Sequence, residues 1–283
     1  MSDRKPLVVC GGSPSSGSTL VAWCFLQRSD MDGVLDARND YLPDMPVVTT
    51  PKIFFKMTIS VFRLSEMLDH YSDEGYVVQP LLVVRDMRSI FNSILSKPYT
   101  SNATTAEDPP LRMRLRRFKE DWLLCRDRNW PIIRYESLVP AEGEKTLRQA
   151  CSDMGLEWDQ AMLDWPKAKA EMADPAHGSP TLRRSMGRNF AETADPKFTK
   201  VKVDRIPPLD LEWLEGEFAE FNRVHNYAEH IEPAGRPADA PQRAVPLWEN
   251  SRRSRKERPM ARLSAAYTRL KNKMLNRQAG SSI

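Results

Sequence analysis

At 283 residues, the chain is long enough for one large α/β domain with a well-buried core, or for two small domains. A hydrophobic fraction of 41% and seven tryptophans argue against a disordered scaffold and favour a globular enzyme. The formal net charge is only +4, and residues 251–283 carry ten Lys or Arg against one acid, so residues 1–250 are close to balanced.

The four cysteines give no indication of a zinc site or of a disulfide framework. Cys10, Cys24, Cys125 and Cys151 have no CxxC spacing and no histidine cluster beside them. We therefore expect small buried thiols in a reducing compartment. The N-terminus leads into a strand-like segment rather than a secretory hydrophobic region, and no run of about 18 apolar residues occurs. These features predict a soluble, cytoplasmic protein.

The first half of the chain predicts strands that alternate with helices. Residues 7–11 form a short apolar run, which is typical of a fully buried strand of a parallel sheet. Apolar positions from Ser18 onward fit a helix, and a second helix is predicted over about 58–72. Residues 81–86 predict another buried strand, followed by a helix over 87–96.

The second half continues the pattern and then loses its periodicity. A helix is predicted over 111–127, a third strand at the end of 130–138, and further helices over 143–154 and 209–226. Residues 166–208 are rich in Pro, Gly, Arg and Lys. A structureless loop of that length is unusual in a compact domain, so we interpret it as a lid or binding segment.

This order of elements predicts an α/β fold. The expected architecture is a single P-loop-like domain, residues 1–232, with a central parallel sheet flanked by helices in doubly wound fashion. Residues 233–250 are interpreted as a linker, and residues 251–283 as a basic amphipathic or disordered tail. In such a sheet the ligand site lies outside the carboxyl ends of the strands.

The segment between the first strand and the first helix has the form of a phosphate-binding turn. From Gly12 it reads GSPSSGST, and Ser18 stands where the P-loop of a nucleotide hydrolase has its lysine. The N–H groups and dipole of a helix N-terminus can hold an anion without a side-chain charge. The loop therefore suits a single 5′-phosphate better than a polyphosphate cleaved with magnesium. The alternative is a Ser-rich turn that merely caps the helix.

Residues 14–19 resemble the PxSGT/S signature of sulfotransferases that use 3′-phosphoadenosine 5′-phosphosulfate (PAPS). The resemblance implies that the loop binds the 5′-phosphosulfate end of the donor, through Ser15, Ser16, Gly17, Ser18 and Thr19. It also implies that an Arg at a strand end and a Ser eight residues later hold the 3′-phosphate. Arg85 and Ser93 fill those two places, and the forked donors of Arg suit a phosphate.

Two further segments are similar to the same family. Residues 132–139 resemble its segment of two apolar residues followed by Tyr-Glu-x-Leu, in which Glu136 is expected to be structural. Residues 205–227 are similar to the C-terminal helix region of tyrosylprotein-sulfotransferase-like members. Alone, Arg85 could instead form a strand-end ion pair with Asp86, and Ser93 could be an exposed helix serine.

The sequence departs from the family at the catalytic positions. Relatives usually carry Arg or Lys where this chain has Ser15, so we take Lys56 as the candidate catalytic cation, with a solvated surface lysine as the alternative. Relatives of the cytosolic type place a His shortly after that lysine, whereas His70 is here interpreted as a surface residue. Asp36, about twenty residues after the loop, is the candidate base, with Asp40 in reserve; the alternative is an ordinary loop Asp.

Basic residues of the late segments supply further candidates. The resemblance implies that a late loop contributes cations to the nucleotide, and residues 183–188 offer Arg183, Arg184 and Arg188. Arg184 and Lys200 are taken as candidate cofactor-binding residues, and a solvated Arg cluster is the alternative. No metal site is expected.

The basic tail suggests contact with an anionic membrane surface. Its Arg and Lys residues and its apolar stripe suit a peripheral helix at the inner membrane face. Few stacking aromatic residues accompany the charge, so nucleic acid is not expected as a partner. The tail could equally be a disordered, solubilising extension.

The motifs together predict a sulfotransferase that uses PAPS and needs no metal. The expected acceptor is a hydroxyl of a glycan, lipid or small molecule. Two alternatives stay open: a P-loop kinase-like phosphotransferase, with Asp86 offered to the metal, and a catalytically silent nucleotide-binding scaffold, motivated by Ser15 and the missing His.

Overall fold

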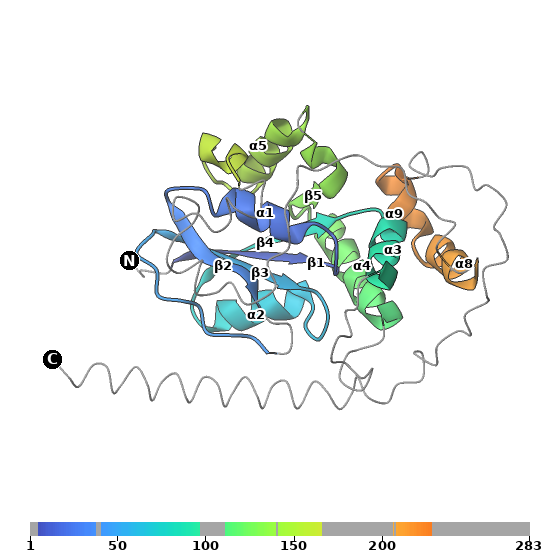
Figure 1. Cartoon of the computed structure of the whole chain (residues 1–283). Helices are drawn as coiled ribbons and strands as arrows, with labels where there is room; N and C mark the ends of the chain where they lie inside the picture. Colours follow the sequence, from blue (N-terminus) through green and yellow to red (C-terminus); the bar gives the residue numbers. More distant parts are fainter. Residues whose placement is uncertain are drawn as a thin grey trace.

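The computed structural model shows a central parallel sheet with helices on both faces (Figure 1). It describes residues 5–37, 41–96, 111–139, 141–165, 206 and 208–227. The sheet has five strands in the order β2-β3-β1-β4-β5. The strands are β1 (Pro6–Gly12), β2 (Met31–Ala37), β3 (Lys52–Thr58), β4 (Val77–Val84) and β5 (Ile132–Arg134).

The central strand β1 is buried on both of its faces. Successive side chains of a strand point to opposite sides, and Leu7 and Val9 pack into one apolar cluster while Val8 and Cys10 pack into the other. Each cluster is covered by helices. A strand apolar on both faces is stable only in the middle of such a three-layer arrangement, which explains why β1 lies at the centre of the sheet.

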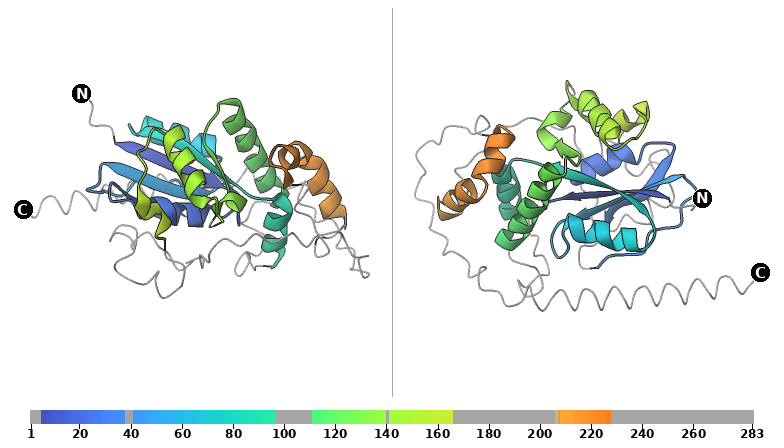
Figure 2. Two further views of the ribbon diagram at one scale, coloured as in Figure 1. Left: turned by 90° about the horizontal axis from the view of Figure 1, so that it is seen from above. Right: turned by 180° about the vertical axis from the view of Figure 1, so that it is seen from behind.

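The helices divide between the two faces of the sheet, as Figures 1 and 2 show. One face is covered by α1 (Ser18–Phe25), α5 (Gly143–Asp153) and a 3₁₀ helix, η2 (Gln160–Leu163). The other cluster includes residues of α2 (Leu64–Asp73), α3 (Met87–Ser96), α4 (Leu111–Asp127), α8 (Pro208–Glu217) and α9 (Ala219–Val224). The predicted doubly wound α/β fold is thus confirmed.

Several element boundaries differ from those predicted. The helix predicted from residue 58 begins at Leu64, because β3 extends to Thr58 and a buried turn containing Ile59 and Phe62 follows. The third strand is only three residues long and continues into a 3₁₀ helix, η1 (Tyr135–Leu138). The helix predicted over 209–226 is interrupted at Phe218, between α8 and α9.

Parts of the predicted organisation fall outside the described residues. The linker and the basic tail do so entirely, and so does the lid segment apart from residues 206 and 208. The domain boundary at residue 232 therefore stays a prediction. Among the helices that the structure describes, none combines the length and the apolar character needed to cross a membrane.

All four cysteines are free and buried, as predicted. Burial raises the pKa of Cys10 to about 12, against the opposing charge of the nearby Lys56. This thiol is therefore protonated near neutral pH, so Cys10 is a packing residue of β1 rather than a nucleophile.

Asp121 on α4 caps the N-terminus of α2. Its carboxylate accepts hydrogen bonds from the backbone N–H groups of Leu64, at 2.7 Å, and Ser65, at 3.4 Å. These are among the N–H groups that have no partner inside the helix itself. Burial raises the pKa of Asp121 to about 6, although the two N–H donors and the charge of Arg63 favour the ionised form. Ionising this carboxyl group is therefore costly in the folded protein.

We predict that Asp121→Asn changes the pH dependence of stability. The pKa of about 6 lies above the ordinary 3.8, so the folded state binds more protons between these values and wild-type stability falls as pH rises through them. Relative to wild type, the variant should gain up to about 3 kcal/mol between about pH 4 and about pH 7. Burial lowers the pKa of His225 to about 4, so this residue makes stability rise with pH. Its contribution is the same in both proteins and cancels in the difference between their free energies of unfolding. Urea unfolding at several pH values measures that difference. A difference that does not change with pH would contradict the raised pKa of Asp121.

Candidate nucleotide-binding site

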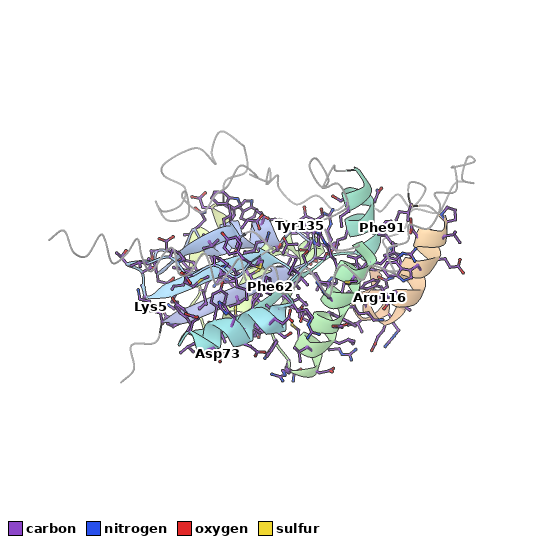
Figure 3. All side chains as sticks on the ribbon, turned by 90° about the horizontal axis from the view of Figure 1, so that it is seen from below. Lys5, Phe62, Asp73, Phe91, Arg116 and Tyr135 are labelled. Atoms are coloured by element: carbon purple, nitrogen blue, oxygen red, sulfur yellow. The ribbon has the colours of Figure 1, made fainter. Side chains whose placement is uncertain are left out.

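The candidate site lies at the carboxyl ends of four neighbouring strands. The loop of residues 13–17 follows β1, Lys56 stands near the end of β3, and Arg85 and Tyr135 directly follow β4 and β5. Because all the strands are parallel, these ends meet at one edge of the sheet, which is the ligand-binding edge of such folds. Figure 3 shows Lys5 at the amino end of the strands and Tyr135 at the opposite end, beside α3.

The loop is tightly wound and ends in a left-handed residue. The N–H of Ser16 donates to the carbonyl of Ser13 at 3.1 Å, and Ser15 and Gly17 both have positive φ, 64° and 88°. A Cβ on Gly12 would come closer than 3.0 Å to the hydroxyl of Ser16. The positive φ at position 17 therefore favours glycine, and a side chain at position 12 would displace the Ser16 hydroxyl.

The N-terminus of α1 opens directly from this loop without a side-chain cap. Gly17 is the N-cap residue and has no side chain, and the first turn contains no acidic residue. The interpretation of a Ser-rich turn that merely caps the helix is therefore wrong for α1, since no hydroxyl fills that role. A helix start of this kind, with its positive dipole end and unsatisfied N–H groups, suits an external anion.

Arg85 and Ser93 both converge on Ser15 in the middle of the loop. Nη1 of Arg85 donates to the carbonyl oxygen of Ser15 at 3.1 Å, and the hydroxyl of Ser93, on α3, donates to that of Ser15 at 3.2 Å. The guanidinium also lies over the ring of Tyr135, 4.5 Å from its centroid. The structure thus brings together the loop and the Arg/Ser pair that the sequence motifs singled out separately.

Tyr135 is a site residue that sequence reasoning missed. Its ring covers Gly17 so closely that a Cβ there would lie less than 3.0 Å from two ring carbons. Tyr135 therefore contacts the loop on one side and Arg85 on the other. Its position directly after a strand was the available signal, but the sequence did not reveal that β5 neighbours β4.

Lys56 and Asp36 form an ion pair beside the loop. Nζ of Lys56 lies 2.7 Å from Oδ1 of Asp36, and 3.3 and 3.4 Å from the hydroxyl oxygens of Thr19 and Thr58. The Lys56 side chain is only 3% exposed, against 36% for Asp36. The interpretation of Lys56 as a solvated surface lysine is therefore wrong. A buried ammonium needs a counter-charge, and Asp36 supplies it.

A β-bulge brings Asp36 to this position. The pairing of β2 with β3 shifts register between Val34 and Ala37, so residues near Asp36 leave the regular ladder. Bulges bend a strand and redirect its side chains, often beside functional sites. Asp36 therefore belongs to the end of an edge strand rather than to an ordinary loop.

Asp86 is buried and its carboxylate is engaged by Arg88. Its carboxylate accepts hydrogen bonds from the backbone N–H and Nε of Arg88, both at 2.9 Å, and from Nη2 at 2.7 Å. Both side chains are 1% exposed. The strand-end ion pair proposed between Arg85 and Asp86 is therefore wrong, and an Asp86 held in this way is not available to a metal ion as the kinase alternative requires.

Other candidates lie elsewhere or outside the described residues. His70 lies in the last turn of α2 against the ring of Tyr71, and α2 ends at the amino edge of β4, opposite the candidate site. No group of three or more His, Cys, Asp or Glu among the described residues is placed to hold a metal ion. The residues that lie outside the described ranges are Asp40, Arg183, Arg184, Arg188 and Lys200.

Comparison with solved structures finds similar chains. One is mouse sulfotransferase SULT7A1 complexed with PAP, 12% identical, with 81% of this chain and 88% of that chain covered and a TM-score of 0.42. Another is the sulfotransferase domain from the Synechococcus PCC 7002 olefin synthase, 16% identical, with 77% and 96% covered and a TM-score of 0.43. Both are sulfotransferases. No family model and no curated protein matches this sequence.

We predict that Gly17→Ala destabilises the protein and closes the loop to ligands. The new methyl group meets the Tyr135 ring, and φ of 88° is strained for alanine, which together should cost about 1–3 kcal/mol or more. Gly216→Ala is the matched control, because nothing lies near its added Cβ and the exchange should stabilise α8 by about 0.5–1 kcal/mol. Chemical denaturation compares the two; equal effects would contradict the close contact with Tyr135.

Proposed function

We propose that the protein transfers a sulfuryl group from PAPS to a hydroxyl group of an acceptor. The observation that carries this proposal is the convergence of Arg85 and Ser93 on Ser15 of the loop, at 3.1 and 3.2 Å. It unites a helix N-terminus that suits one anion with an Arg/Ser pair that suits another. A nucleotide with phosphates at both its 3′ and 5′ positions matches that pair of sites.

The two proposed anion sites lie at the ends of neighbouring strands. They follow β1 and β4, which are neighbours in the sheet, and adjacent strands lie about 4.8 Å apart. One nucleotide could therefore contact both sites, with its ribose between them. In the proposed complex, the N–H groups and hydroxyls of residues 15–19 hold the 5′-phosphosulfate, while Arg85 and Ser93 hold the 3′-phosphate.

Lys56 and Asp36 would supply the charges that sulfuryl transfer needs. As the acceptor oxygen bonds to sulfur, the bond from sulfur to the bridging oxygen of the donor breaks, and adenosine 3′,5′-bisphosphate leaves with the negative charge. Lys56, within 3.3 Å of Thr19, would stabilise that charge in place of the basic residue that relatives carry at position 15. Asp36 would accept the proton from the acceptor hydroxyl.

The acceptor and the location of the protein complete the proposal. The acceptor is a hydroxyl of a glycan, a lipid or a small molecule, and the enzyme works in the cytoplasm. Its basic tail, residues 251–283, would bind the anionic inner face of the membrane, where a lipid-linked acceptor would be within reach. Arg184 and Lys200 are proposed as additional nucleotide ligands.

We predict that Arg85→Ala weakens binding of adenosine 3′,5′-bisphosphate by roughly 10- to 100-fold, since it removes charged hydrogen bonds to the 3′-phosphate. Calorimetry without magnesium measures the affinity. Arg148→Ala, which removes an exposed arginine of α5 paired with Glu144, should leave it unchanged. If the wild-type protein ignores the bisphosphate but binds ATP with magnesium, the kinase alternative replaces this proposal.

We predict that Asp36→Asn lowers the rate of transfer by about 10²-fold or more, since the amide cannot accept the proton. The affinity for adenosine 3′,5′-bisphosphate should not fall, because the proposed nucleotide ligands are unchanged and the amide no longer neutralises the charge of Lys56 beside the loop. Transfer of radiolabel from PAPS to acceptors in a cell extract measures the rate, and Asp44→Asn, at an exposed position after β2, is the control. Unchanged transfer by Asp36→Asn would exclude its role as base, and no transfer by the wild type would favour the silent scaffold.

A further inference from the structure

Glu136 connects the backbone at Arg85 to the C-terminal helices. Its Oε1 accepts a hydrogen bond from the backbone N–H of Asp86 at 3.0 Å, and its Oε2 accepts one from the phenol of Tyr227 at 2.9 Å. Glu136 belongs to η1 after β5, whereas Tyr227 follows α9. One carboxylate thus joins three segments that are far apart in the sequence.

The bond to Asp86 fixes the peptide from which Arg85 projects. Pairing between β4 and β5 ends at Val84 and Arg134, so the next peptide has no ladder partner in β5. The carboxylate of Glu136 takes over that role with a charge-assisted hydrogen bond, which is stronger than a neutral one. The direction in which Arg85 leaves the sheet therefore depends on Glu136.

Tyr227 is in turn held at both ends. Its phenol donates to Glu136, and its backbone carbonyl accepts a hydrogen bond from Arg88, the same residue that binds Asp86. Tyr227 is fully buried, and burial raises its pKa, so the phenol keeps the proton that it donates. Arg88 also contacts Glu215 of α8 at 3.1 Å. The C-terminal helices are thus bonded to the residues that directly follow Arg85 in the chain.

We propose that Glu136 and Tyr227 are positioning residues for Arg85, so that the packing of α8 and α9 sets the affinity for the 3′-phosphate. This inference rests on the proposed function. Neither residue needs to touch the nucleotide. Their effect passes through the Arg85–Asp86 peptide, so it should be specific to ligands that carry a 3′-phosphate and should vanish when Arg85 is absent.

The test compares two ligands by calorimetry without magnesium: adenosine 3′,5′-bisphosphate, and adenosine 5′-phosphosulfate, which has no 3′-phosphate. Glu136→Gln removes the charge and turns one of the two accepting oxygens into an NH2 donor, so it should weaken binding of the bisphosphate by about 10-fold and leave binding of the phosphosulfate within about twofold. In the Arg85→Ala background, the same substitution should change bisphosphate affinity by less than about twofold, because coupled residues are not additive.

Tyr227→Phe provides a milder variant in case Glu136→Gln fails to fold. It keeps the buried ring and removes only the donor to Glu136. We therefore expect a smaller loss of affinity for the bisphosphate, again with the affinity for the phosphosulfate unchanged. Tyr76→Phe, at a half-buried tyrosine before β4, is the matched control and should have no effect.

The outcomes separate this inference from the proposed function. If the variants weaken binding of both ligands equally, Glu136 and Tyr227 only stabilise the fold. The same conclusion follows if their losses in bisphosphate affinity add to the loss caused by Arg85→Ala. A wild-type protein that binds the bisphosphate through Arg85, with both variants unaffected, would overturn the positioning role alone. A wild-type protein that does not bind the bisphosphate would overturn both.

Discussion

The register between β1 and β4 is the constraint on which the whole site depends. Gly12, the last residue of β1, pairs with Val83, so the loop after β1 and Arg85 after β4 leave the sheet at the same level. A shift of one residue would move Arg85 by about 3.3 Å relative to Ser15 and turn the side chains of β1 to the wrong faces. The burial of both faces of β1 therefore determines the geometry of the site as well as the stability of the sheet.

Positive charge approaches the loop from three elements, and the two side-chain cations among them have local partners. The positive end of the α1 dipole lies at the loop that follows β1. Lys56 belongs to β3, and Arg85 directly follows β4. Asp36 balances Lys56, while a carbonyl and the Tyr135 ring hold Arg85. If the proposed function holds, an arriving dianion meets cations that are already in place, which reduces the reorganisation needed for binding and catalysis.

The C-terminal helices are attached to α4 by opposite charges. Arg112 pairs with the buried Asp210 at 2.9 Å, and Arg116 and Lys119 both reach Glu217. Figure 3 labels Arg116 on α4, on the side that faces α8. Exposed pairs of this kind contribute little stability, but the buried one is costly to break. Together with the apolar contacts of Phe218 and Phe221, they bring Tyr227 to Glu136.

The sequence by itself determined the fold class, because strands and helices show in local periodicity, and it singled out the loop and the Arg85/Ser93 pair through their resemblance to short sulfotransferase motifs. It also singled out Lys56 and Asp36, but not that they contact each other. That contact required strand order: β2, β3 and β1 are adjacent only in the folded sheet, and a bulge redirects Asp36. Tyr135, Glu136 and Tyr227 likewise acquire their partners from elements up to 139 positions apart. Contacts of that range depend on which surfaces pack together, and only the tertiary structure decides this.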